Sequence, residues 1–109
     1  MRPYADKLEI VALEGELDVA RKQEIRDALQ LRPGARAVLV DLTGVSYADS
    51  TALSELLRFC LEARRDAVAA AVLVTAPQLV RLIDLAGLTA AFNVFNDRNK
   101  ALSYLQSGS

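Results

Sequence analysis

The sequence contains no histidine, which removes the commonest general base of hydrolases and the commonest zinc ligand. A Ser-His-Asp catalytic triad is therefore excluded. The single cysteine, Cys60, can form no internal disulfide, and one cysteine without histidine cannot complete the usual zinc site. A lone cysteine of this kind is typical of a protein of the reducing cytoplasm.

Glycine is scarce as well: the five glycines stand at positions 15, 34, 44, 87 and 108. This scatter excludes both the dinucleotide-binding Gly-x-Gly-x-x-Gly pattern and the Walker phosphate loop, so direct nucleotide binding has no motif here. The residues around Ser50 also lack the Gly-x-Ser-x-Gly turn of hydrolases. We therefore expect a protein that is not an enzyme and needs no cofactor.

No sign of charge dominates, because 13 basic and 14 acidic residues leave a formal net charge of −1. This balance predicts neither nucleic acid nor an anionic membrane as a partner. No apolar run reaches the ~20 residues that span a bilayer, and the first ten residues lack the apolar core of a signal peptide. These features predict a cytoplasmic protein, with a single domain over residues 1–105 and a disordered tail over 106–109.

What the sequence has is a regular alternation of strand and helix patterns. Strands are predicted at 7–15 (mostly buried and ended by Gly15), 35–42, 69–74 and 91–95. Helices are predicted within 16–34, from Ser50 to about Asp66, within 75–88, and from Asn96 or Asp97 to Leu105, while 43–49 is predicted as a loop. The order predicts an α/β fold with a four-stranded, mixed or mostly parallel sheet flanked by four helices.

The helix that begins at Ser50 has a clear apolar stripe at helical spacing. The stripe comprises Leu53, Leu56, Leu57, Cys60 and Leu61. The predicted exposed face comprises Glu55, Arg58, Glu62 and Arg65. Phe59 lies off the stripe, and we expect it to pack in the core. Cys60 is expected to be a small buried hydrophobic residue without a redox role.

Three polar residues in a row, Asp49, Ser50 and Thr51, stand where this helix begins. Each is a good helix cap, since its side-chain oxygen accepts a hydrogen bond from a free amide at the helix start. One cap needs only one such residue, so at least one hydroxyl is left over. A phosphate on that hydroxyl would add about −1.5 to −2 charge near the positive end of the helix dipole. The junction thus predicts a modifiable surface for a partner.

Three segments of the chain resemble the STAS family, named for sulfate transporters and anti-sigma factor antagonists. They are LEGELDVA (13–20), VLVDLTGVSYADSTAL (38–53) and RLIDLAGLTAAFNVF (81–95). They occur in the family's order and with its spacing, and are most similar to the stand-alone bacterial antagonists. Ala52 and Ser54 stand where the family usually has glycine.

The resemblance implies partner switching. The unphosphorylated antagonist binds an anti-sigma factor, which is a serine kinase of the GHKL ATPase type, and frees the sigma factor. Phosphorylation of the first hydroxyl after the aspartate, Ser50, breaks the complex, and a serine phosphatase restores it. Asp18 and Asp49 match acidic positions beside this serine, although each is equally explained as a cap, and Thr51 and Ser54 are expected to contact the partner as well.

A second hypothesis keeps the same helix face but a different partner. Some small STAS proteins are permanent subunits of transporter ATPase complexes, without turnover of phosphate. The absent family glycines favour this alternative.

Overall fold

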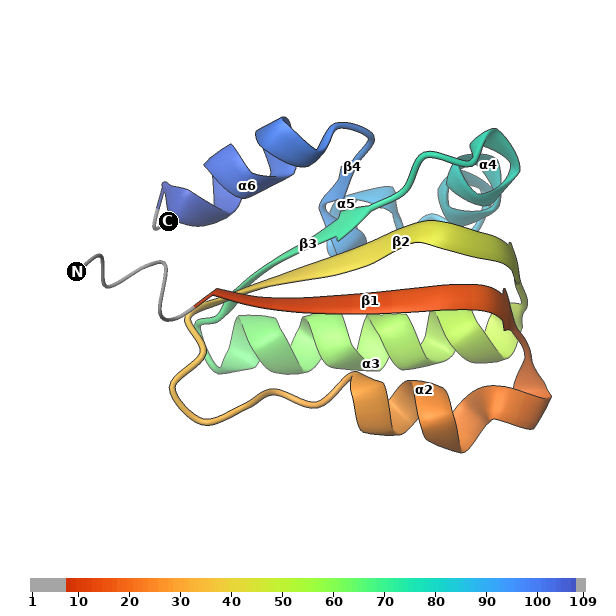
Figure 1. Cartoon of the computed structure of the whole chain (residues 1–109), viewed down its shortest axis with the longest axis horizontal. Helices are drawn as coiled ribbons and strands as arrows, with labels where there is room; N and C mark the ends of the chain where they lie inside the picture. Colours follow the sequence, from red (N-terminus) through yellow and green to blue (C-terminus); the bar gives the residue numbers. More distant parts are fainter. Residues whose placement is uncertain (1–7, 108–109) are drawn as a thin grey trace.

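The computed structural model describes residues 8–107, which form a parallel sheet with helices on both faces (Figure 1). The strands are β1 (Leu8–Leu17), β2 (Ala37–Ala48), β3 (Ala69–Leu73) and β4 (Val94–Phe95). The helices are the 3₁₀ turn η1 (Val19–Arg21), α2 (Lys22–Ala28), α3 (Ser50–Arg65), α4 (Pro77–Leu85), α5 (Thr89–Phe92) and α6 (Arg98–Gln106). The sheet order is β1-β2-β3-β4 and every described pair is parallel, which confirms the predicted α/β fold.

Two hydrophobic clusters hold the helices on the sheet. The larger one packs α2, α3, α4 and α5 on one face, with Phe59, Leu56 and Ile25 fully buried. The smaller one packs α6 on the other face through Ala101 and Leu105. Because β2 and β3 lie between the two clusters, their apolar runs are buried on both sides, as the sequence predicts.

The first strand is less buried than expected. It lies at the edge of the sheet, and its Ile10 side chain is 54% exposed. Only Leu13 and Leu17 of this strand are buried. The prediction of a mostly buried strand is wrong here because α6 packs over β2 and β3, so the described helices leave much of the outer face of β1 uncovered.

Both of the first two strands run further than predicted. Gly15 has a positive φ of 77°, yet β1 continues to Leu17. The segment 43–48, predicted as a loop, continues β2 and pairs with the end of β1, with Leu17 opposite Ala48. Register shifts between the paired stretches let this irregular sequence stay in the sheet. As a result, Asp18 and Asp49 leave the sheet side by side.

The helices differ from the prediction at two places. The helix expected after Asp18 is the short η1 turn followed by α2. A fifth helix, α5, takes the first part of the strand predicted at 91–95, and Asn93 ends it in the left-handed conformation with a φ of 50°. Pro77 at the start of α4 agrees with the prediction.

The last helix is capped by Asp97, whose carboxylate accepts from the backbone N–H of Lys100 at 3.1 Å. The helix ends at Gln106, so the predicted tail of 106–109 begins within its last turn. Residues 1–7 of the predicted domain lie outside the described residues, and so do residues 108–109 of the predicted tail.

Candidate functional site

The junction singled out from the sequence lies at the carboxyl edge of the parallel sheet, where β1 leads into η1 and β2 leads into α3 (Figure 1, right). In α/β folds this edge is where ligand and partner sites are usually placed, because the loops there converge. The backbone N–H of Asp49 donates to the carbonyl of Leu17 at 3.2 Å, which fixes the two chain segments to each other.

Both carboxylate oxygens of Asp49 accept hydrogen bonds from the backbone. One oxygen, Oδ1, accepts from the N–H groups of Thr51 at 2.9 Å and Ala52 at 3.2 Å, which makes Asp49 the cap of α3. The other, Oδ2, accepts from the N–H of Val19 at 3.2 Å. One side chain thus ties the start of α3 to η1.

Asp18 is also a cap, but a smaller one. Its Oδ1 accepts from the N–H of Ala20 at 3.1 Å within the η1 turn. The capping interpretation of Asp18 and Asp49 is therefore confirmed for both residues, and it leaves their contribution to a partner surface a prediction.

The hydroxyl of Ser50 is not needed for capping. The Ser50 side chain is exposed, and the structure of residues 8–107 gives its oxygen no hydrogen bond. Thr51 is half-buried and Ser54 is exposed one turn later. These three residues line one shallow depression together with Lys22 and Glu55. The structure therefore brings Ser50, Thr51 and Ser54 to one surface, directly after the cap residue Asp49.

The helix pattern predicted that Glu55 is exposed, but the structure buries it. It is only 4% exposed, and its Oε1 accepts from the Nε atoms of Arg26 at 3.1 Å and Arg58 at 3.0 Å. Arg58 in turn pairs with Glu62 and donates to the carbonyl of Leu29 at 3.2 Å. Helix α2 covers this part of α3, so the prediction of an exposed face is wrong for Glu55, whereas Arg65 at the end of the same face is exposed as predicted.

Burial raises the pKa of the Glu55 carboxyl, but the hydrogen bonds and charges of Arg58 and Arg26 outweigh it and hold this pKa below its ordinary value. Glu55 is therefore charged at neutral pH. Arg26 and Arg58 compensate this charge inside the domain. Glu55 therefore has a structural role in the depression, beneath Ser54.

Three further residues at this edge were not singled out from the sequence. Val19 is 66% exposed and Tyr47 is 54% exposed, and they lie on the two chain segments that meet at Asp49. Lys22 lines the depression and is the only cation among its described lining residues. The position of Tyr47, two residues before Asp49, could have indicated from the sequence that it lies at this edge. No local sequence pattern indicates that η1 brings Val19 and Lys22 to the same edge.

Along the rest of α3, the predicted burial is confirmed for two residues and wrong for a third. Phe59 is fully buried and Cys60 is 6% exposed, as predicted, whereas Leu61 of the expected stripe is 50% exposed. Burial raises the pKa of the Cys60 thiol to about 11, against a small opposing effect of Arg64, so the thiol is protonated and a poor nucleophile at neutral pH.

Within residues 8–107 no helix is both long and apolar enough to cross a bilayer.

The α/β fold agrees with the protein family whose model matches this sequence. The model of the STAS domain matches residues 5–101, which is most of the chain. The chain therefore belongs to the STAS domain family. No curated protein sequence gives a significant match.

Solved structures with the same fold come from two functional groups. An anti-sigma factor antagonist from Mycobacterium paratuberculosis is 22% identical, with a TM-score of 0.77, and the match covers 93% of this chain and 87% of that one. A sulfate transporter family protein from Wolinella succinogenes is 18% identical, with a TM-score of 0.76 and coverages of 94% and 87%. The anti-sigma factor antagonist SpoIIAA in its unphosphorylated form is also 18% identical, with a TM-score of 0.72 and coverages of 93% and 90%.

Proposed function

We propose that this STAS domain is an anti-sigma factor antagonist that works by partner switching, with Ser50 as the phosphate acceptor. The observation that carries the proposal is the division of labour at the start of α3. The Asp49 side chain accepts from the amides of Thr51 and Ala52 at the helix start, and the neighbouring Ser50 hydroxyl stays exposed and unbonded within residues 8–107. A kinase can therefore reach this oxygen without unfolding the cap.

A phosphate on Ser50 would keep its charge on the surface. The N–H groups of Thr51 and Ala52 already donate to the Asp49 side chain, and that of Leu53 donates to its carbonyl at 3.1 Å. Few backbone donors are left to draw the phosphate inward, and Lys22 is the nearby cation on the depression. About −1.5 to −2 added charge beside Asp49 then repels an acidic partner surface, and contact with an apolar one costs desolvation of the phosphate, while the fold is unchanged.

The partner in this proposal is a GHKL-type anti-sigma serine kinase, and a serine phosphatase reverses the modification. The exposed Val19 and Tyr47 side chains provide apolar area beside Ser50 on which such a protein can dock. The ATP belongs to the partner, and the proposal places the exchange in the cytoplasm. The similarity to two anti-sigma factor antagonists supports this choice of partner.

The experiment incubates the purified protein with each GHKL kinase of the source organism and Mg-ATP, followed by mass spectrometry of the peptides. We expect one phosphate, located on Ser50, and none on the Ser50→Ala variant. Ser54→Ala is the matched control, because Ser54 lines the same depression and should leave the labelling intact. Labelling of Ser50→Ala at the wild-type rate, or no labelling by any of these kinases, would overturn the assignment.

A second candidate function has its own support in the transporter-linked structures, which share this fold at similar TM-scores. In that case the chain is a permanent subunit of a transporter ATPase complex, and α3 docks without phosphate turnover. Affinity purification of the wild type and of Ser50→Glu separates the two. An anti-sigma kinase retained only by the wild type supports partner switching, and transporter subunits retained by both variants support the alternative.

A further inference from the structure

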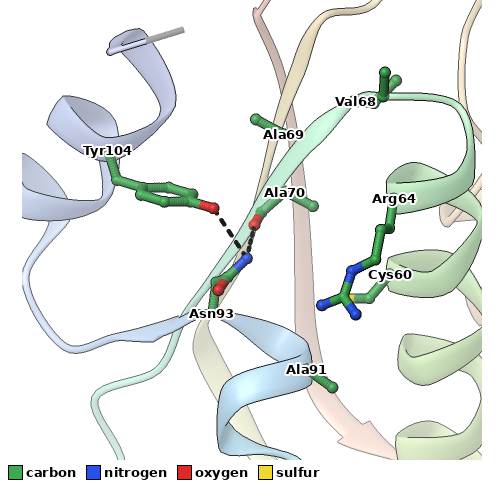
Figure 2. A pocket seen from close by; sticks show the side chains of 9 residues that line it. Cys60, Arg64, Val68, Ala69, Ala70, Ala91, Asn93 and Tyr104 are labelled. Carbon is green, nitrogen blue, oxygen red and sulfur yellow. Dashed lines mark hydrogen bonds between the residues drawn. The ribbon is translucent and has the colours of Figure 1, made fainter. Parts of the chain in front are cut away.

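A pocket of about 420 Å³ lies at the opposite end of α3 from Ser50, between the end of this helix, the start of β3 and α6 (Figure 2). It exists because β4 has only two residues and pairs with Val72 and Leu73, so no strand of the described part of the chain lies beside the first part of β3 on its outer edge. The side chains there are alanines, Ala69 and Ala70, which are too small to fill the space.

One wall of the pocket carries an ordered hydrogen-bond chain. The side-chain amide of Asn93 donates to the carbonyl of Ala70 at 3.0 Å and to the hydroxyl oxygen of Tyr104 at 3.2 Å (Figure 2). Both N–H groups of the amide are then used, so the Tyr104 hydroxyl has its own hydrogen left to donate. The ring of Tyr104 is held by Phe95, with the two centroids 5.5 Å apart.

The edge of β3 adds a backbone donor to the same wall. In a strand, the N–H and the carbonyl of one residue point to the same side. The carbonyl of Ala70 meets Asn93, so the N–H of Ala70 also points away from β2 and toward the pocket. This N–H and the Tyr104 hydroxyl are two hydrogen-bond donors beside an apolar floor.

The other wall carries a positive charge. Arg64 extends from α3 toward the pocket, beside Cys60 (Figure 2), and has no ion pair within residues 8–107, whereas its neighbour Arg65 pairs with Asp66 at 3.5 Å. Among residues 8–107 no carboxylate lines the pocket, and the buried Cys60 thiol is neutral. The guanidinium of Arg64 is therefore an uncompensated charge, which favours an anion at this place.

We propose that this pocket binds a small organic molecule with a single carboxylate, a site separate from the Ser50 surface and independent of the function proposed for it. The carboxylate pairs with Arg64, and the apolar body lies on Val68, Ala70 and Ala91. The polar wall of Asn93 and Tyr104 accommodates a hydroxyl or amide at the far end of the molecule. The volume is within the range of about 300–1,000 Å³ that small-molecule sites occupy.

The experiment is a ¹⁵N-HSQC titration of the full chain with matched pairs of probes: 4-hydroxybenzoate against 4-hydroxybenzamide, and hexanoate against hexanamide. We expect saturable shifts at Ala70 and Asn93 with the carboxylates and about tenfold weaker binding of the neutral amides, because a charge-assisted hydrogen bond is lost. Equal binding of carboxylates and amides, or the absence of saturable shifts at these amides, would overturn the proposal.

Two variants locate the binding. Arg64→Gln should weaken the carboxylates about tenfold and remove their advantage over the amides, while Arg65→Gln, the matched neighbour, should bind like the wild type. Ala91→Leu should abolish binding by filling the pocket while Arg64 is kept, and its HSQC spectrum checks that the fold is intact. Carboxylates that bind Ala91→Leu normally would indicate a surface contact with arginine and contradict a pocket site.

Discussion

The two ends of α3 use their polar groups in opposite ways. At its start, the polar atoms of Asp49 are consumed by the fold, and the hydroxyl of Ser50 is left for chemistry. At its end, the charge of Arg64 has no ion pair within residues 8–107 and borders a pocket floored by alanines. The first end is suited to carry an added group on an unchanged scaffold, and the second end to take a ligand into a space that the scaffold leaves open.

The largest effect that tests this contrast is expected for Asp49→Ala. The variant leaves the amides of Thr51, Ala52 and Val19 without their acceptor, so we expect the free energy of unfolding to fall by about 2–3 kcal/mol. Urea denaturation measures it. Asp18→Ala removes a single capping bond and should cost less than half as much. Equal losses in the two variants would show that Asp49 does not join η1 to α3.

The buried charge beneath the depression should have the next largest effect, and it should depend on pH. Because the folded pKa of Glu55 is lowered, its contribution is fully present above the unfolded value of 4.5 and is lost as the pH falls through the folded pKa. Glu55→Gln should therefore cost about 1–2 kcal/mol at pH 7 and progressively less below pH 4.5.

Urea midpoints of wild type and Glu55→Gln between pH 3 and pH 7 test this dependence. Glu16→Gln is the control, because Glu16 is exposed and its carboxylate has no hydrogen bond or ion pair within residues 8–107. A constant difference between wild type and Glu55→Gln over the whole pH range would contradict a charged, compensated Glu55.

A smaller effect of opposite sign is expected beside the pocket. Ala67 has a φ of 59°, a left-handed conformation that costs residues with a Cβ about 1–2 kcal/mol. Ala67→Gly should raise the free energy of unfolding by about 0.5–1 kcal/mol, since glycine adopts this φ freely but loses more entropy on folding. Ala90→Gly, in α5, should instead lower it. A loss of stability in Ala67→Gly would contradict the strain.

The sequence predicted the parts of the fold that local patterns encode. The apolar runs of β2 and β3, Pro77 at the start of α4 and the caps Asp18 and Asp49 each depend on a few neighbouring residues, and each is confirmed. The α/β class follows from their alternation. The Ser50 surface was predictable for the same reason, because three polar residues at one helix start exceed what a single cap requires.

What the sequence could not predict depends on which elements meet in space. Glu55 has the periodicity of an exposed residue, and only the packing of α2 on α3 with Arg26 buries it. The pairing of 43–48 with the end of β1 overrides a loop-like sequence. The pocket depends on the short β4 leaving the edge of β3 open, and no pattern around Arg64 or Asn93 indicates that they line the same space.

The smallest effect should occur at the residue that matters most for the proposed function. Ser50→Ala removes a hydroxyl that has no hydrogen bond within residues 8–107, at a helix position where alanine is equally favourable, so the free energy of unfolding should change by less than about 0.5 kcal/mol. Urea denaturation of Ser50→Ala and Asp49→Ala under the same conditions compares the free energies of unfolding of the two variants. A loss near that of Asp49→Ala would mean that the hydroxyl supports the helix start, and the division between a structural carboxylate and a free hydroxyl would no longer hold.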